Sequence, residues 1–246
     1  MHGLFVFGNL CVLEKKIHRV VQPYLLQNSL FFQDLPGNEM ELLIKSGRKE
    51  SGKRGKLLFR QGTFPKGVIW LLNGKVKIYQ ETPSGQRQTL YIYTDGDLIG
   101  YRQLIADVVH PVSACLLEDT TFLHIQSETF RGLIRDSPLF ARNVLSMLAR
   151  EFTVWMNRMT VFTQYPVRHR LLLALLILHN LYRDKDNSKT VITMTRTELA
   201  EYVGASLETV VRALNKLKAQ GLVHISGREI RLMDPAGLIS MVEKED

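Results

Sequence analysis

The residues with the clearest chemical potential lie on one face of a short stretch near the C-terminus, residues 204–223. Apolar residues recur there at helical spacing and predict an amphipathic helix. Steps of about 100° per residue place Glu208, Val211, Arg212 and Asn215 opposite that apolar seam. A helix fits the major groove of B-DNA, where arginine donates twice to a guanine edge, glutamate accepts from a cytosine amino group and valine meets a thymine methyl. The face therefore predicts base reading.

The alternative is a solvated face on which Glu208 and Arg212 form an ion pair between positions i and i+4. Such a pair contributes only about 0.3–0.5 kcal/mol. The two interpretations are compatible, because the pair would hold Arg212 in place for a base. Flanking residues favour a DNA partner: Leu207 begins the face, and we expect phosphate contacts from Arg196, Thr197, Lys216 and Arg228.

The residues before this helix carry the signals that would position it. Thr195, followed three residues later by Glu198, predicts a capping box that starts a first helix. Gly204 then predicts a left-handed turn, which glycine adopts without a side-chain penalty, and Ser206 caps the second helix. This spacing is typical of a helix-turn-helix. The following segment "VHISGREIRL" (223–232) predicts a hairpin with Arg228 at its tip, which is the wing of a winged helix-turn-helix.

A long helix is predicted upstream, over residues 137–163, where apolar residues alternate in steps of four and three. It would be about 40 Å long, too long to be covered wholly by a neighbouring roll of about 100 residues. We therefore expect part of it to form a parallel dimer, the alternative being that it docks on its own domain. Pro166 ends the helix. The apolar repeat begins at Ala141, and the dimer seam is predicted at Leu145, Leu148, Phe152, Trp155, Met159 and Phe162.

Short β-like runs separated by glycines occupy residues 57–126 and predict a small antiparallel roll or barrel. A helix-like stretch, "PGNEMELLIKSG", precedes them and would cover one end. With the helical segments that follow, the fold class is α+β.

The overall charge of +8 and pI near 9.5 are compatible with a polyanionic partner but decide little alone. The distribution of charge along the chain is more informative. Residues 61–136 have 7 Lys/Arg against 8 Asp/Glu, whereas residues 166–233 have 11 Lys/Arg against 6 Asp/Glu, so the C-terminal segment is the more basic of the two. The basic cluster at residues 45–60 is either a solvated pair of turns or a contact surface.

Other features argue against several classes of protein. The two cysteines, Cys11 and Cys115, have no C-x-x-C partner, so no disulfide framework or zinc site is predicted, and a reducing cytoplasm is expected. His110 and His124 lack the pairing of a metal site. The longest apolar run, residues 171–182, is too short to span a bilayer. We expect the first residues to form a weakly ordered or amphipathic leader, and expect no cofactor and no membrane contact.

Three stretches together resemble the transcription regulators of the cyclic-AMP receptor protein and fumarate–nitrate regulator (Crp/Fnr) family, over about residues 28–235. They are "GKVKIY" with "GDLIG", the long helix, and "TRTELAEYVGASLETVVRALNKL" with "GLV" and "GREI". The resemblance implies a homodimer that binds double-stranded DNA at a palindromic operator, with RNA polymerase as a partner. It implies a leader (1–27), a cyclic-nucleotide-binding-like β-roll or jelly roll as sensor (28–136), a dimerisation helix (137–164) and a winged helix-turn-helix (166–240).

The recognition helix keeps the Glu and Arg of the family as Glu208 and Arg212. Leu207 replaces the extra arginine of the cyclic-AMP receptor protein, which favours a half-site of the fumarate–nitrate type. Val211 stands where that type often has serine.

The ligand pocket departs further from the family. Cyclic-AMP binders resemble one another in a Gly-Glu pair for the ribose and an Arg-Ser pair for the cyclic phosphate. Here Tyr101 replaces the Glu, and His110-Pro111 stand where Arg-Ser is expected. A buried phosphate without a fixed cation is costly, so we expect weak or no cyclic-AMP binding and an unidentified effector. The candidate effector pocket comprises Gly100, Tyr101, Arg102, Gln103, His110 and Pro111. The four-cysteine cluster of oxygen-sensing relatives is absent.

The sequence leaves three alternative functions open. They are an effector-independent regulator, a small-molecule sensor that acts mainly through protein contacts, and an enzyme of the metal-bearing β-barrel type. The enzyme is the least expected, because the sequence lacks clustered His and Glu ligands on adjacent strands.

Overall fold

The computed structural model describes residues 13–245, except 27, 33 and 184–189. The chain divides into two compact units, which are described in turn. One unit is Leu26–Thr153; the other joins Met1–Leu25 to Val154–Asp246. Cys11 lies outside the described residues.

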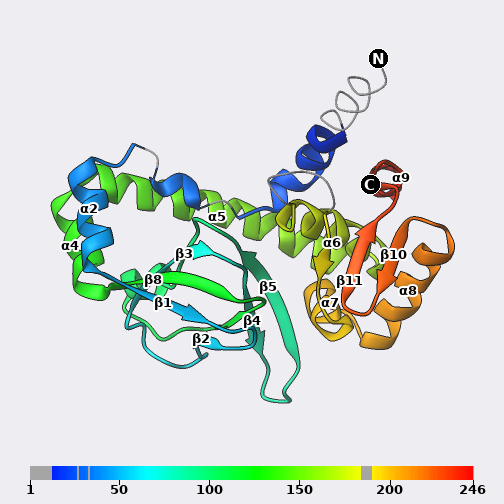
Figure 1. The fold of residues 1–246 in the computed structure, drawn as a ribbon, viewed down its shortest axis with the longest axis horizontal. Coiled ribbons are helices and arrows are strands. Elements are labelled where there is room, and N and C mark those ends of the chain that lie inside the picture. The colour runs from blue at the N-terminus through cyan, green and yellow to red at the C-terminus, as the bar shows by residue number, and fades with distance from the viewer. Residues whose placement is uncertain (1–12, 27, 33, 184–189, 246) are drawn as a thin grey trace. The chain divides into compact units, whose positions relative to one another are not determined.

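The first unit contains two four-stranded antiparallel sheets, ordered β1-β8-β3-β6 and β2-β7-β4-β5 (Figure 1). This confirms the predicted antiparallel roll and the α+β class. Its strands are β1 (Gly47–Gly52), β2 (Leu57–Phe59), β3 (Gly67–Asn73), β4 (Val76–Glu81), β5 (Arg87–Tyr93), β6 (Leu98–Ile99), β7 (Ser113–Leu116) and β8 (Thr120–Gln126).

Glycine is required at the tight connection between β3 and β4. Gly74 has a φ of 112°, and a Cβ there would lie 2.4 Å from Oγ1 of Thr120. Only a residue without a side chain can combine that backbone conformation with so close an approach. The glycine punctuation in the sequence therefore marks real turns in this roll.

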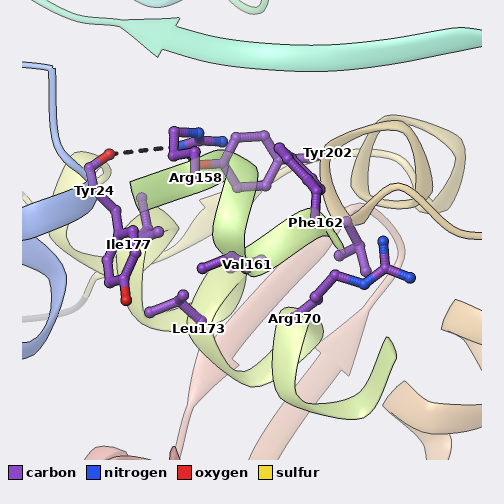
Figure 2. Close-up of a pocket in the computed structure, with 10 residues that line it drawn as sticks. Tyr24, Arg158, Val161, Phe162, Arg170, Leu173, Ile177 and Tyr202 are labelled. Atoms are coloured by element: carbon purple, nitrogen blue, oxygen red, sulfur yellow. Dashed lines mark hydrogen bonds between the residues drawn. The ribbon is translucent and has the colours of Figure 1, made fainter. Parts of the chain in front are cut away.

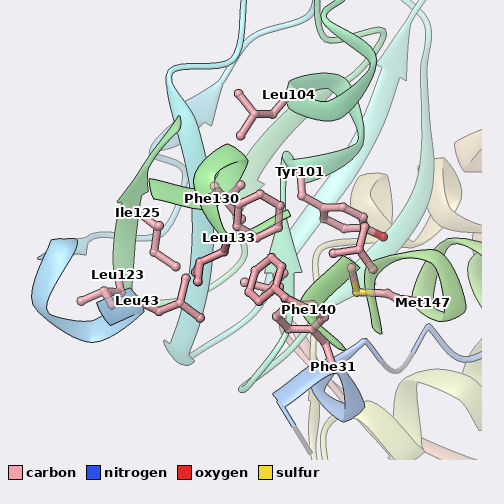
Figure 3. Packing of buried hydrophobic residues seen from close by; sticks show 13 residues of the cluster. Phe31, Leu43, Tyr101, Leu104, Leu123, Ile125, Phe130, Leu133, Phe140 and Met147 are labelled. Carbon is pink, nitrogen blue, oxygen red and sulfur yellow. The ribbon is translucent and has the colours of Figure 1, made fainter. Parts of the chain in front are cut away.

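Helices α2 (Gly37–Ser46), α3 (Tyr101–Ala106), α4 (Ser127–Asp136) and the first half of α5 (Pro138–Gln164) complete this unit. Figure 3 shows the core they share with the sheets. The rings of Phe31 and Phe130 meet that of Phe140 edge-on, with centroids 4.8 and 5.2 Å apart. Such pairs add about 0.5–1.5 kcal/mol beyond the burial of their area.

Helix α5 has the predicted extent, but its apolar residues serve two purposes. Leu148 packs against the core of the roll, and Trp155 and Phe162 are half-buried. Leu145 and Phe152 are 66% and 64% exposed in the single chain. The apolar stripe open to solvent is therefore narrower than the predicted seam, and it includes a residue that the seam omitted: it consists of Leu145, Phe152, Met156 and Met159.

The second unit is mainly helical and carries a small three-stranded sheet, ordered β10-β11-β9 (Figure 1). The apolar run at its centre forms most of α6, which is buried on all sides from Leu171 to His179, as expected for a core helix. None of the helices in the described part of the chain combines the length and the hydropathy of a membrane-spanning segment. The second unit contains α6 (Val167–Leu181), β9 (Ile192–Thr193), α7 (Arg196–Val203), α8 (Leu207–Ala219), β10 (Val223–Ser226), β11 (Glu229–Leu232) and α9 (Pro235–Glu245).

The described part of the N-terminal leader belongs to this second unit. Residues 13–21 are helical, and Ile17, Val21 and Leu25 are buried. Glu14 forms an ion pair with Arg183 at 2.8 Å. The leader is expected to be either weakly ordered or amphipathic, and residues 13–21 form an amphipathic helix.

Candidate nucleic-acid interface

The start of α7 has the capping box that the sequence predicts. Oγ1 of Thr195 accepts a hydrogen bond from the amide of Glu198 at 3.1 Å, and the Glu198 carboxylate accepts one from the amide of Thr195 at 2.8 Å. Gly204 ends the helix with a φ of 69° and donates its amide to the carbonyl of Ala200. The helix-turn-helix prediction is confirmed in its local detail.

Helix α8 presents its polar face to solvent. Ser206 caps it by accepting a hydrogen bond from the amide of Thr209 at 3.2 Å. Three residues anchor it in the unit: Val210, Leu214 and Leu217 are buried. On the other side Val211 is half-buried, and Leu207, Glu208, Arg212, Asn215 and Lys216 are exposed, among others.

The charged groups on this face are available to a partner. Among the described residues, neither the Glu208 carboxylate nor the Arg212 guanidinium has an ion-pair partner, so the i,i+4 pair between them is not formed. A helix of this kind can place both groups against base edges in a major groove.

The predicted wing is also present. Strands β10 and β11 pair from Val223↔Leu232 to Ser226↔Glu229, which leaves a two-residue loop of Gly227 and Arg228. Gly227 has a φ of 53°, and the side chain of Arg228 is exposed. Among the predicted phosphate contacts, Thr197 is exposed as well. Arg196 differs, because its guanidinium donates to the carbonyl of Gly227 at 2.9 Å.

The residues predicted to line an effector pocket line neither of the two cavities described below. Gly100 has a φ of 87° and begins α3. Tyr101 is wholly buried, and its hydroxyl points out of the core cluster in Figure 3 and donates to the carboxylate of Glu151 on α5. Arg102 donates to the hydroxyl of Tyr93 at 2.9 Å, and its Nε lies 3.5 Å from the same carboxylate. Gln103 is half-buried.

Glu151 is the centre of a buried polar network within the first unit. Its side chain is 4% exposed and also accepts a hydrogen bond from the amide group of Asn28 at 3.1 Å. Asn28 in turn accepts a hydrogen bond from the amide of Leu98 at 2.7 Å. Desolvation raises the pKa of Tyr101, so its phenol stays protonated and can donate to Glu151. The sequence offered no signal for Glu151 or Asn28, since their partners lie far away in the chain.

His110 is buried in an aromatic stack. Its ring lies on that of Phe59, with centroids 3.9 Å apart and planes at 11°. Burial lowers the pKa of His110, and its Nδ1 has no hydrogen-bond partner within the part of the chain that the structure describes. Pro111 beside it is exposed. A groove of ≈ 450 Å³ lies elsewhere on the roll, and none of the six predicted pocket residues lines it; it is lined by Leu57, Arg60, Gln61, Tyr79, Glu81, Thr82, Pro83, Arg87 and Ser113.

A second cavity lies within the unit that contains the helix-turn-helix (Figure 2). Arg158 of α5 donates to the carbonyl of Tyr24 at 3.4 Å and to the hydroxyl of Tyr202 on α7 at 3.1 Å. Its guanidinium stacks over the rings of Tyr202 and Phe162, at 5.0 and 6.0 Å. The cavity is only ≈ 20 Å³, about the room that one water molecule needs. Arg158 therefore joins the end of α5, α7 and the leader.

Three of the seven basic side chains in the cluster at residues 45–60 pair with neighbouring acids. Lys45 pairs with Glu41 at 2.6 Å, Arg48 with Glu50 at 2.6 Å, and Lys53 with Asp119 at 2.5 Å. Part of it forms β1, which is an edge strand, and charged side chains on an edge oppose pairing with another sheet.

The described residues contain no group of three or more His, Cys, Asp or Glu side chains placed to hold a metal ion. Cys115 lies half-buried on β7, and its thiol is directed at the carbonyl of Leu116 at 3.8 Å.

Comparison with known families agrees with this architecture. The cyclic nucleotide-binding domain family matches residues 49–137, and the Crp-like helix-turn-helix domain family matches residues 169–241. The chain belongs to the Crp/Fnr family of transcription regulators. The Crp/Fnr resemblance inferred from the sequence is thereby confirmed.

Curated Crp/Fnr relatives align with most of the chain. The Cyclic AMP receptor protein of Thermus thermophilus is 28% identical over 211 residues, covering 86% of this chain and 95% of that protein. The Transcriptional activator protein Anr of Pseudomonas protegens is 27% identical over 221 residues, covering 89% and 88%.

Solved structures share the Crp/Fnr fold. A putative Crp/Fnr regulator from Eubacterium rectale superposes with a TM-score of 0.72 at 20% identity, covering 87% of this chain and 99% of that one. The c-di-GMP responsive regulator CLP of Xanthomonas campestris gives 0.68 at 22% identity, covering 80% and 99%. These matches are to transcription regulators.

Proposed function

We propose that this Crp/Fnr regulator acts in the cytoplasm as a homodimer that binds a palindromic DNA site through α8 and works with RNA polymerase. In this proposal residues 28–136 are the sensor, 137–164 the dimerisation helix and 166–240 the DNA-binding domain, with 1–27 as a leader. The residues proposed to serve DNA binding are Arg196, Thr197, Ser206, Leu207, Glu208, Val211, Arg212, Asn215, Lys216 and Arg228, of which Arg196 acts through the wing.

One observation carries the proposal of base reading. Helix α8 is anchored by a buried apolar side, and on its other side Glu208 and Arg212 stand exposed without an ion-pair partner among the described residues. Two unpaired charges of opposite sign on a rigid helix suit base edges, which offer both acceptors and donors. A face that served only solubility would gain from pairing them.

The experiment for base reading is binding-site selection from random DNA, followed by affinity measurements on Arg212→Ala. We expect the variant to lose about 1–3 kcal/mol at one base pair of each half-site and to bind other sequences as before. Lys216→Ala is the control, because loss of a phosphate contact weakens all sequences alike. Equal losses on selected and random DNA for Arg212→Ala would contradict base reading.

The proposal of a dimer rests on the apolar stripe of α5. Leu145, Phe152, Met156 and Met159 are exposed in the single chain and recur along one side of the helix. A long helix needs a partner for such a stripe. Half-sites one turn of DNA apart, about 34 Å, then match the two-fold symmetry.

Phe152→Glu tests the dimer by native mass spectrometry. We expect a monomer, because two carboxylates would face each other across the seam. Phe64→Glu is the matched control, since Phe64 is 69% exposed on a loop of the roll and lies outside α5. A Phe152→Glu protein that stays dimeric would place the interface elsewhere.

We further propose that cyclic AMP is not the effector, although relatives are named for cyclic AMP and c-di-GMP. Tyr101 and Arg102 are engaged with Glu151, and His110 is stacked on Phe59. The same engagement favours a second candidate, a regulator that needs no effector. Calorimetric titration with cyclic AMP is expected to show no binding, and a micromolar affinity would overturn this part.

A further inference from the structure

The wing is held to the start of α7 by an arginine. Arg196 is the first residue of α7, and its Nη2 donates to the carbonyl of Gly227, in the wing loop, at 2.9 Å. The two residues are 31 positions apart in the chain. The contact closes the base of the wing loop onto the helix-turn-helix.

A second bond holds the next residue of the loop. The amide of Met194 donates to the carbonyl of Arg228 at 3.1 Å, and β9 pairs with β11 through Glu229↔Thr193. Both carbonyls of the two-residue loop are thus bonded to the segment that leads into α7. The backbone that carries the Arg228 side chain is therefore fixed from one side by Arg196.

The surroundings of Arg196 disfavour direct contact with DNA. Its Nη1 is buried and has no hydrogen-bond partner among the described residues, so a phosphate oxygen cannot reach that nitrogen while the wing is in place. Burial also lowers the pKa of Arg196. The start of a helix carries partial positive charge and repels a cation, so the Gly227 carbonyl is the acceptor that holds the guanidinium there.

We propose that Arg196 is a positioning residue for DNA binding: it fixes the wing loop so that Arg228 meets a backbone phosphate, and does not bind phosphate itself. The inference depends on the proposed DNA-binding function. It reassigns a residue that the sequence suggests as a phosphate ligand, and it predicts that Arg196 and Arg228 act as one unit.

A double-mutant cycle on the selected operator tests this, with Arg196→Met, Arg228→Ala and the double variant in the full chain. We expect each single variant to bind about tenfold more weakly, as for loss of one charged hydrogen bond. The double variant is expected to bind like Arg228→Ala within about twofold, because the two side chains serve one phosphate contact. Its salt dependence should match as well, lower than that of the wild type by about 0.9 in slope.

Two independent phosphate ligands would give a different result. The losses would then multiply to about a hundredfold, and the salt slope of the double variant would fall by about 1.8. Either outcome overturns the proposal. Failure of the DNA-binding function is distinguishable, because the wild-type protein would then select no operator at all.

Hydrogen exchange on the free protein gives a readout that DNA does not influence. The amide of Met194 is expected to exchange faster in Arg196→Met and at the wild-type rate in Arg228→Ala. Unchanged protection in Arg196→Met would refute the wing contact. If Arg196→Met does not fold, as judged by thermal unfolding, the neutral and helix-compatible Arg196→Gln takes its place in the cycle.

Discussion

Replacing Glu151 by glutamine removes the negative charge from the buried network of the roll while keeping the shape of the side chain. The carboxylate is 4% exposed, whereas the side chain of Arg102 beside it is 34% exposed. Breaking a fully buried ion pair costs about 3–5 kcal/mol. Partial solvation of Arg102 reduces this, and the amide oxygen can still accept the hydrogen bond from Asn28. We therefore expect Glu151→Gln to destabilise the roll by about 2 kcal/mol.

Urea unfolding measures this loss in a Trp155→Phe background. Trp70 is then the only tryptophan left in the sequence, and it stacks on Phe32 in the first unit at 4.1 Å, so its fluorescence reports on the roll. With a slope of about 2 kcal/mol per molar urea, the midpoint should fall by about 1 M.

An exposed ion pair provides the control for Glu151→Gln. Glu81 and Arg87 lie 2.5 Å apart with side chains 38% and 46% exposed. Loss of such a pair costs about 0–1 kcal/mol. If Glu151→Gln shifts the midpoint no more than Glu81→Gln does, the buried charge of Glu151 does not stabilise the roll.

Two further predictions concern the stability of each unit. Burial lowers the pKa of His110 below its ordinary value of 6.5, so its contribution to stability is present above about pH 6.5 and is lost as the pH falls below that value. His110→Phe, which keeps a ring to stack on Phe59, should show a smaller drop in urea midpoint between pH 7.5 and 5.5; an equal drop would contradict this role. Ile17 is buried in the unit that contains the helix-turn-helix, so Ile17→Asp should lower the thermal midpoint by about 5 °C or more, while Lys16→Asp, exposed on the same helix, should leave it unchanged. Equal midpoints for the two variants would mean that the leader does not stabilise this unit.

The sequence alone predicted the local features of the DNA-binding unit. The capping box of Thr195 and Glu198, the turn at Gly204 and the hairpin at Gly227 each depend on residues within a few positions of one another. Their steric and hydrogen-bonding requirements are met by the local backbone, so residue type and spacing suffice to predict them. The roll was predictable in the same way, from alternation and glycine turns.

The tertiary structure decided which side chains from distant parts of the sequence contact one another. The sequence predicts Tyr101 and Arg102 as pocket residues, and packing brings both to Glu151, about 50 positions away. The sequence predicts Arg196 as a phosphate ligand, and its guanidinium donates to the carbonyl of Gly227.

The long helix shows the same division between local pattern and tertiary packing. Its heptad pattern marks apolar positions without saying which of them the roll covers, so Leu148 packs inward while Leu145 and Phe152 stay exposed. Spacing along a chain determines what a residue can do within its own helix or turn. The partner of a buried charge or an apolar side chain depends on which elements pack against it, and that is settled only when the chain folds.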